Sequence, residues 1–587
     1  MTPISSLLHA ARRALLFATL LGLAACSRKA PDPNDREGPI EAREIDLRDA
    51  PRETAAPLLG GAQGATLVEV LRQIEAVRRL PRVRGLFLRF GSMPGSWARA
   101  GELRSALLDV RRAKKPIHCY FESADNVAYR LMAEVCDRIT APPSGDLELV
   151  GLSLHLVFLR DLLEKVGVQA ELQQAGKFKG AADPLTEREA TPALRSSLEA
   201  LLSDMHAQLA SAIAEGRKMP RAEVERILDR GPFEAETAKA AHLIDALEYD
   251  DHAREALRQK SGAKHLRRID LGHGAPKLSV RELWKSFNQD EGDEDEEDHI
   301  ALVVLEGSIT DGEGSSYDEV GSGALIAELR RLRNDSKVKA VVLRVHSPGG
   351  SALASDLIWQ ALRELARRKP VIASLGDLAA SGGYYVASAA TEVFAEAGSL
   401  VGSIGVVGGK IRVEELADKA GIRTLILEKS KHAAFNSPLR RYSDEERRLL
   451  KQSIWRTYER FVQRVSVGRK LSRKKVLAAA EGRVMSGRKA LDAGLVDHLG
   501  GLRPALGRAR QLAHLKADAG IEEWPPRRGL LDALSQGFGA RSQAVSLPFQ
   551  ELSLSLAGFE TRALWHYVRA LQQGQDLALL PGALSIR

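Results

Sequence analysis

One serine in this sequence stands in surroundings that suit a nucleophile. Residues 376–390, GDLAASGGYYVASAA, place Ser381 among alanines and glycines, where another backbone can approach its hydroxyl closely. The same small residues would also suit close helix packing. A serine hydroxyl becomes nucleophilic when a nearby base takes its proton, and lysine can act as that base as well as histidine. Because lysine must be neutral to do so, its pKa of about 10.4 has to fall through burial or a neighbouring positive charge.

Two lysines stand at matching positions in alanine-containing segments. Lys179, in GKFKGAADP, precedes Thr191 by twelve residues, and Lys431, in EKSKHAAFNSP, precedes Ser443 by the same number. Thr191 and Ser443 are each predicted to cap a helix, because a hydroxyl residue there precedes a helical pattern. Either lysine is a candidate base.

The elements that must position these residues occur twice along the chain. The segments VRGLFLRFGSMPGS (83–96) and VKAVVLRVHSPGGS (338–351) are identical at six of fourteen positions. Aligning Tyr129 with Tyr384 places Asn126 at the position of Ser381, so only the second copy has a candidate nucleophile. Apolar, β-branched runs alternating with helical periods predict an α/β fold, with mostly parallel sheets and covering helices. The SPGG turn lacks the spacing of a phosphate-binding loop.

Three motifs in order carry a family resemblance: LRVHSPGGSALASD, ASLGDLAASGGYYVASAA and GSLVGSIGVVGG. Together with the degenerate upstream copy, they resemble the bacterial signal peptide peptidases in their long, tandem-repeat form, over about residues 65 to 510. The resemblance implies a serine protease with a Ser–Lys dyad, on two tandem domains related to the Clp protease and crotonase folds. It also implies a ring, expected to be a homotetramer.

The resemblance assigns roles to five residues. Ser381 is expected to be the nucleophile and Lys179, from the first copy, the general base; Gly350 and Gly382 would supply oxyanion-hole N–H groups, and Ser403 would orient the lysine amine. Under this assignment Lys431 would face the next subunit as a relic, although it stays open as an alternative base. His346 departs from the asparagine usual before SPGG. It is a further candidate base, although a histidine at a strand end more often orders a loop.

The N-terminal residues predict export. Arg12 and Arg13 precede the apolar run ALLFATLLGLAA (14–25), and LAAC (23–26) resembles a lipobox whose Cys26 becomes lipidated. The alternative is a cleaved secretory signal or a short uncleaved anchor with an incidental cysteine. We therefore expect a membrane-anchored lipoprotein that faces the periplasm.

Composition shifts divide the rest of the chain. The predicted parts are a signal at 1–26, a tether at 27–63, a first repeat domain at 64–285, an acidic linker at 286–299, a second repeat domain at 300–515 and an extension at 516–587 whose role is open. Cys119 and Cys136 are predicted to be buried and unpaired, although export would permit a disulfide.

Composition also limits the function. A net charge of +8 over 587 residues, with 5% aromatic residues and no concentrated basic face, argues against nucleic acid as a partner. Two cysteines without histidines at ligand spacing give no metal signature, and we expect no metal and no cofactor. The expected activity is a serine endopeptidase that cuts hydrophobic peptides, such as remnant signal peptides. The alternatives are a catalytically silent, ring-forming scaffold and, less favoured because coenzyme A is intracellular, a crotonase-like acyl-CoA enzyme.

Overall fold

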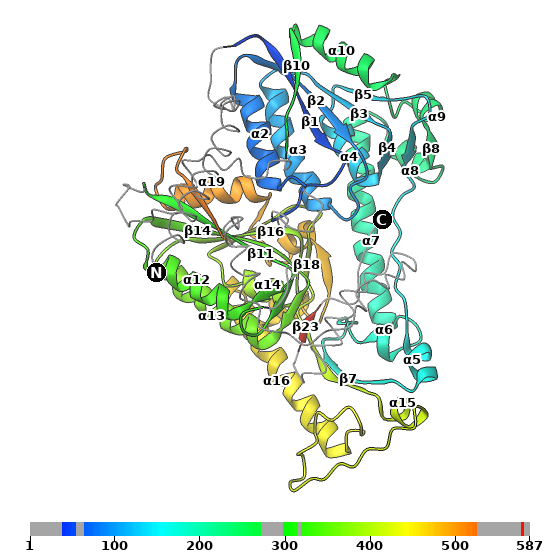
Figure 1. Ribbon diagram of the computed structural model, residues 1–587, viewed down its shortest axis with the longest axis vertical. Coiled ribbons are helices and arrows are strands. Elements are labelled where there is room, and N and C mark those ends of the chain that lie inside the picture. Colours follow the sequence, from blue (N-terminus) through cyan, green and yellow to red (C-terminus); the bar gives the residue numbers. More distant parts are fainter. Residues whose placement is uncertain (1–37, 55–63, 272–296, 315–318, 525–576, 580–587) are drawn as a thin grey trace, which may run out of the picture.

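The computed structural model describes residues 38–54, 64–271, 297–314, 319–524 and 577–579. Two α/β units lie one above the other in Figure 1, the first in blue through cyan to the green of α10 and β10, and the second in green to orange. The predicted signal with Cys26, much of the predicted tether and most of the acidic linker lie outside the described residues. No helix of the described part is both long and apolar enough to cross a membrane.

The first unit is built on a six-stranded parallel sheet. Its order is β10 (His265–Arg268), β1 (Glu41–Leu47), β2 (Val83–Phe90), β3 (Ile117–Phe121), β5 (Arg138–Ala141) and β9 (Ala246–Leu247). Leu86 and Leu88 of β2 are buried in one apolar cluster and Phe87 in another. Burial on both faces explains the continuous apolar sequence of the strand, because helices cover both sides of such a sheet.

The second unit repeats this strand order. Its parallel strands follow as β22 (Ile521–Trp524), β11 (His299–Glu306), β14 (Val338–Ser347), β16 (Val371–Ala380), β17 (Glu392–Ala395) and β21 (His498–Leu499). Each strand of the first sheet thus has a counterpart in the same place. The prediction of two repeated α/β units with mostly parallel sheets is confirmed.

The helices also follow the repeat. Those of the first unit are α2 (Leu67–Arg79), α3 (Trp97–Arg112), α4 (Asn126–Val135), α5 (Arg160–Val166), α6 (Asp183–Thr186), α7 (Pro192–Arg217), α8 (Arg221–Leu228), α9 (Ala235–Ala240) and α10 (Asp250–Ser261). Those of the second are α12 (Ser322–Asn334), α13 (Ala352–Ala366), α14 (Gly382–Ala387), α15 (Glu414–Lys419), α16 (Asp444–Arg469), α17 (Arg473–Ala479), α18 (Gly487–Asp492) and α19 (Leu502–Leu512). The hydroxyls of Thr191 and Ser443 cap α7 and α16, as predicted.

Two predicted boundaries differ from the structure. Strand β1 lies inside the segment predicted as a tether, and β22 lies in the predicted extension. The charges of β1 suggested a solvated segment, but they are paired in the fold: Arg43 Nε bonds Glu41 at 3.0 Å, and Glu44 accepts two bonds from Arg254. Pairing offsets the cost of burying these charges, so a charged sequence forms an interior strand.

The prediction of two unpaired cysteines is wrong. Cys119 lies on β3, and Cys136 is the residue that ends α4. The helix returns the chain to the strand, so that the two Cα atoms lie 5.9 Å apart and the residues form a disulfide. The sequence separation of 17 suggested that the two cysteines lie far apart in space. They lie close together because α4 packs against β3, the strand that precedes it.

A mixed sheet joins the two units. Its order is β13 (Glu319–Gly321), β12 (Ser308–Thr310), β15 (Gly349–Ser351), β23 (Leu577–Leu579), β19 (Val406–Arg412) and β7 (Gln169–Ala175). Strand β7 belongs to the first unit and pairs antiparallel with β19 of the second along its whole length. The smaller strands are β4 (Ser123–Asp125), β6 (Asp146–Glu148), β8 (Phe233–Glu234), β18 (Leu400–Gly402) and β20 (Val484–Ser486).

Candidate active site

Ser381 lies at a sharp turn between a buried strand and a short helix. Strand β16 ends at Ala380 and α14 begins at Gly382, so Ser381 alone makes the turn. Its φ of 53° and ψ of −116° are unusual for a residue with a Cβ, and its N–H donates to Gly402 O at 2.7 Å. The surrounding structure therefore holds the serine in one strained conformation, which is typical of functional positions.

Lys179 reaches this serine from the other unit. It follows β7, and the pairing of β7 with β19 brings it across the junction. Lys179 Nζ lies 2.7 Å from Ser381 Oγ, 3.0 Å from Ser403 O and 3.1 Å from Ser403 Oγ. The structure thus brings together three of the residues that the sequence singled out.

The lysine amine is held in surroundings that disfavour its charge. Lys179, Ser381 and Ser403 each have no exposed surface. Burial holds the pKa of Lys179 well below the usual lysine value of 10.5, and among the described residues no carboxylate pairs with it. A neutral amine within hydrogen-bond distance of a serine hydroxyl can accept the proton of that hydroxyl.

Glycines that sequence reasoning missed make room for the lysine. A Cβ on Gly482 would lie 2.3 Å from Lys179 Cα, and a Cβ on Gly405 would lie 2.8 Å from Lys179 Cδ. The neighbouring N–H of Phe178 donates to Glu481 O at 2.6 Å. In the sequence these positions are marked only by a glycine, Gly482 in EGR and Gly405 in SIG. A glycine alone does not indicate which residue packs against it.

Gly350 and Gly382 lie close to one another beside the nucleophile. A Cβ on Gly382 would stand 3.1 Å from Gly350 N and 2.7 Å from Ser355 Oγ, and a Cβ on Gly350 would stand 2.0 Å from Ile309 O. Both positions therefore require glycine. The start of α14 and strand β15 approach closely here, which suits two backbone N–H groups that converge on one oxygen.

The corresponding position in the first unit is closed by side-chain hydrogen bonds. Asn126 Nδ2 donates to Gly151 O at 2.8 Å, and its Oδ1 accepts from Val150 N at 3.2 Å. Lys431 is not near it: its side chain is 70% exposed and forms an ion pair with Glu445. The structure therefore does not bring Lys431 to either Ser381 or Asn126 within this chain.

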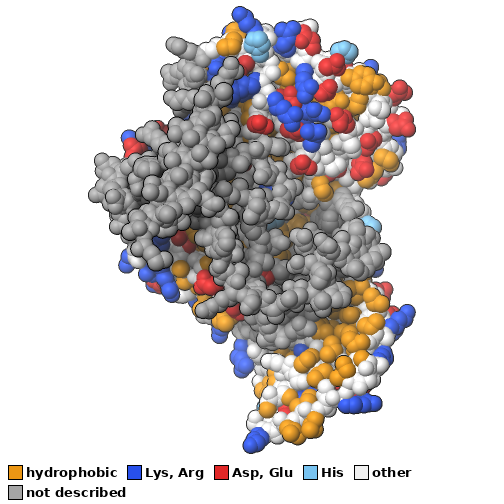
Figure 2. Space-filling view, in the orientation of Figure 1, with side chains coloured by type: hydrophobic (Ala, Val, Ile, Leu, Met, Phe, Trp, Pro, Cys, Tyr) orange, Lys and Arg blue, Asp and Glu red, His pale blue; other side chains and the backbone are white. Residues whose placement is uncertain are grey.

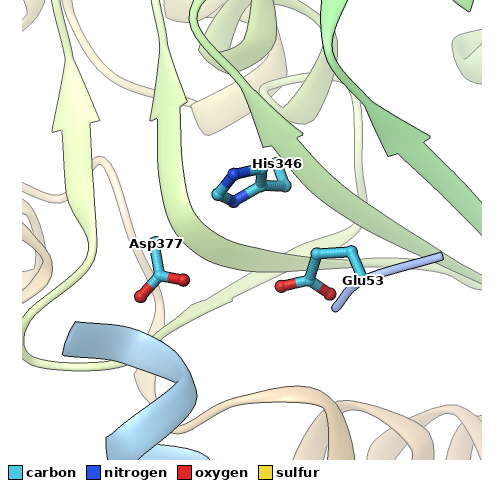
Figure 3. Close-up of side chains that lie close together, drawn as sticks. All are labelled: Glu53, His346 and Asp377. Atoms are coloured by element: carbon cyan, nitrogen blue, oxygen red, sulfur yellow. The ribbon is translucent and has the colours of Figure 1, made fainter. Parts of the chain in front are cut away.

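His346 lies in an ionic cluster at the junction of the two units, as Figure 3 shows. Ligand atoms of His346, Glu53 and Asp377 lie within 4.8 Å of one another, as a metal site would require. However, Arg344 binds both oxygens of Glu53 at 2.7 and 2.8 Å, and Arg99 Nε binds Asp377 at 2.5 Å. The guanidinium groups neutralise the carboxylates, so we interpret the cluster as a junction between the units. No pattern in the sequence indicated this junction.

Two repeated α/β units, with a strained serine of one beside a buried lysine of the other, form the arrangement expected of a serine hydrolase. The family model for "Peptidase family S49" matches residues 109–264 and 363–516, together more than half of the chain. The chain belongs to peptidase family S49, and it is a serine peptidase. This confirms the predicted resemblance.

Curated relatives match over most of the chain. "Serine protease SPPA, chloroplastic" of Arabidopsis thaliana is 32% identical over 470 residues, which are 78% of this chain and 68% of that protein. "Protease 4" of Haemophilus influenzae is 29% identical over 475 residues, 78% of this chain and 74% of that protein. Among solved structures, a point mutant of ClpP1 from Listeria monocytogenes matches with a TM-score of 0.24 at 15% identity, over 35% of this chain and 94% of that chain.

Proposed function

We propose that the protein is a membrane-anchored endopeptidase that uses a Ser381–Lys179 dyad to cut hydrophobic peptides, such as remnant signal peptides. The observation that carries the dyad is the buried amine 2.7 Å from the serine hydroxyl, with its lowered pKa. The substrate class rests on the motif resemblance, and the anchor rests on the LAAC motif at Cys26.

In the proposed reaction, neutral Lys179 takes the proton of Ser381 Oγ as this oxygen attacks the scissile carbonyl carbon. The N–H groups of Gly350 and Gly382 stabilise the negative charge that develops on the carbonyl oxygen. Ser403 accepts hydrogen bonds from the amine and so directs its lone pair toward Ser381. The protonated lysine then gives its proton to the leaving amine, and water hydrolyses the acyl-serine with the lysine again as base.

Covalent labelling followed by substitution tests this proposal. A fluorophosphonate probe is expected to modify Ser381, as mapped by peptide mass spectrometry. Lys179→Ala and Ser381→Ala are expected to abolish cleavage of an apolar fluorogenic peptide, whereas Lys431→Ala retains most of it, because this exposed lysine lies away from the serine. Full activity in Lys179→Ala together with loss in Lys431→Ala would overturn the assignment of the base.

We also propose a homotetrameric ring, and the internal repeat supports it. Within one chain, β7 of the first unit pairs with β19 of the second. The offset of 254 that relates β6 to β18 places residues 423–429, RTLILEK, at the counterpart of β7, and residues 152–158, LSLHLVF, at the counterpart of β19. Residues 423–429 form no described strand and expose Leu425 and Leu427 by 81 and 83%.

The same pairing between copies would join segment 423–429 of one chain to segment 152–158 of the next. Figure 2 shows hydrophobic side chains gathered over the lower end of the molecule, around α5, β7 and α15. Repeated head-to-tail contacts of this kind form a closed ring when the rotation from one chain to the next divides a full turn evenly. Replacing Leu425 and Leu427 together by Glu is expected to yield monomers in light scattering, and an unchanged assembly would contradict this interface.

The lipid anchor has a separate test. Cys26 is expected to incorporate a radiolabelled fatty acid when the full sequence is expressed in a bacterium, and Cys26→Ser is expected to abolish the label and release the protein from the membrane fraction. A Cys26→Ser protein that stays in the membrane fraction would show that another part of the chain carries the attachment.

A further inference from the structure

A cavity of about 740 Å³ lies at the junction of the two units. Helices α3, α4, α7 and α8 of the first unit line one side of it, and the segment after β17, together with α18 and α19, lines the other. Neither Ser381 nor Lys179 lines it, so the cavity is separate from the candidate active site. Its volume is in the range of cavities that hold small organic molecules.

Several polar groups that line this cavity have no partner. Arg130 of α4 packs its guanidinium 5.4 Å from the centre of the Trp97 ring and 3.6 Å from Glu134, yet its Nη1 is buried without a hydrogen bond. Gln208 of α7 is 6% exposed, and its Oε1 is a buried acceptor without a donor. Arg488 of α18 forms no ion pair with any described residue. Because buried polar groups are nearly always hydrogen-bonded, a bound molecule would account for these groups.

Glu396 lines the same cavity from the second unit. Its carboxyl lies against α3 of the first unit, where a Cβ on Gly101 would stand 2.6 Å from Glu396 Oε2. The carboxyl has no hydrogen-bond partner in the part of the chain that the structure describes. Burial and the neighbouring Glu102 raise the pKa of Glu396 to about 8, so at neutral pH this residue can donate a proton to an acceptor in the cavity.

The unpartnered groups match the C-terminal end of a peptide. Two guanidinium groups and a protonated carboxyl can donate hydrogen bonds to a carboxylate, and Gln208 Oε1 can accept one from an amide N–H. The carboxylates of Glu134, Asp204 and Glu215 also line the cavity and offset much of the positive charge of its arginines. This balance favours a ligand with one negative charge over a more highly charged phosphate.

We propose that this cavity binds short peptides through their C-terminal carboxylate, held by Arg130 of the first unit and Arg488 of the second. The inference goes beyond the proposed function, because binding requires no cleavage. A ligand held from both sides binds only when the units are docked, so it shifts the population toward the docked form. In that form Lys179 lies beside Ser381.

Calorimetric titration of the full chain with N-acetyl-dialanine tests this proposal. A Ser381→Ala background keeps the probe from being cleaved, and N-acetyl-dialanine amide, which lacks the carboxylate, is the matched ligand. We expect the acid to bind at pH 7 and to raise Tm, and the amide to do neither. Inorganic phosphate is titrated in parallel, and binding of phosphate without binding of the acid would overturn the peptide assignment.

Substitution of one arginine locates the binding. Arg488→Met should weaken the affinity for N-acetyl-dialanine about tenfold, because a charge-assisted hydrogen bond is lost. Arg473→Met is the control and should leave the affinity unchanged, because Arg473 is exposed and pairs with Glu459 outside the cavity. Equal binding of the acid and the amide, or an unchanged affinity in Arg488→Met, would overturn the proposal.

The pH dependence of binding gives a second readout. As pH rises from 7 to 9, Glu396 loses the proton that it donates and gains a negative charge, so the affinity for N-acetyl-dialanine should fall. Glu396→Gln keeps an N–H donor without a charge, and its affinity should stay constant. The guanidinium groups near Glu396 do not titrate in this range, and Glu102 is paired with Arg344 at 2.7 Å. The charged groups that face Glu396 are Glu102 and Arg104 from α3, Arg130 from α4, Arg344 from β14 and Arg488 from α18. A parallel fall in Glu396→Gln would contradict the proposed contact between Glu396 and the ligand.

Discussion

Replacing Lys179 by methionine should stabilise the protein, by an amount that depends on pH. Burial holds the pKa of this lysine well below 10.5 in the native state, whereas the unfolded chain keeps the ordinary lysine value. Between the two pKa values the unfolded state binds one proton more, so the stability of the wild type rises with pH. Methionine has no such proton, and it fills a similar volume.

The size of the effect follows from proton linkage. Each pH unit below 10.5 in which the native lysine stays neutral costs the wild type about 1.4 kcal/mol. The difference in unfolding free energy between Lys179→Met and wild type should therefore grow by about 1.4 kcal/mol for each unit of falling pH. The lost hydrogen bonds to Ser381 and Ser403 add only an offset that does not depend on pH.

Thermal unfolding by scanning calorimetry at pH 8, 9 and 10 measures this difference. For a cooperative unit of about 200 residues, 1.4 kcal/mol corresponds to roughly 3–5 °C in Tm. Lys431→Met is the matched control, because its side chain is 70% exposed, and its difference in Tm from wild type should stay constant. A pH-independent difference for Lys179→Met would show that the lysine is charged in the native protein, and would refute the proposed general base.

Three further predictions concern other parts of the fold. Gly382→Ala should lower kcat about 100-fold, because the added Cβ would lie 3.1 Å from Gly350 N and disturb the proposed oxyanion donors. Gly507→Ala is the control and should leave kcat unchanged, because its Cβ meets nothing within 4 Å. A kcat of Gly382→Ala equal to that of the wild type would exclude an oxyanion role for Gly382. Burial and the neighbouring Glu102 raise the pKa of Glu396 to about 8, so stability should fall as pH rises from 4.5 to 8. Glu396→Gln should therefore raise Tm at pH 8.5 but not at pH 5, and a gain at both would contradict that pKa. Reducing the disulfide, which closes a loop with a separation of 17, should cost about 3 kcal/mol in chemical unfolding, and an unchanged midpoint would show that the thiols are already free.

The architecture could be predicted from the sequence because the same pattern of strands and helices occurs twice along the chain. Apolar runs bounded by turn residues indicate buried parallel strands, and the constant offset between 83–96 and 338–351 shows that the two units share one strand order. The equal spacing of twelve residues to Thr191 and to Ser443 identified Lys179 and Lys431 as equivalent residues. The offset between 83–96 and 338–351 also placed Asn126 at the position of Ser381, which the identical bonds of Tyr129 to Leu243 O and Tyr384 to Leu495 O support.

The errors came from residues whose partners are distant in sequence. The charges of β1 are compatible with a strand because Arg254, more than two hundred residues away, pairs with Glu44. Periodicity and composition describe only neighbours along the chain, and they carry no information about such partners. The prediction of unpaired cysteines was wrong for a related reason. The disulfide depends on how α4 packs on β3, and no local sequence pattern indicates this packing.

The ion pairs at the junction between the units could not be predicted from the sequence, and they help to position the candidate site. Arg344 of β14 is 1% exposed and pairs with Glu53 and Glu102 of the first unit. A buried arginine without these carboxylates would be very costly, so the junction favours one relative orientation of the units. Strand β14 leads into β15, which contains Gly350, and β16, held through Asp377 to Arg99, leads to Ser381. The contacts that orient the units thus also orient the strands that end at the site. Lys179 and Ser381 come from different units, so the burial that lowers the lysine pKa exists only when the units are docked.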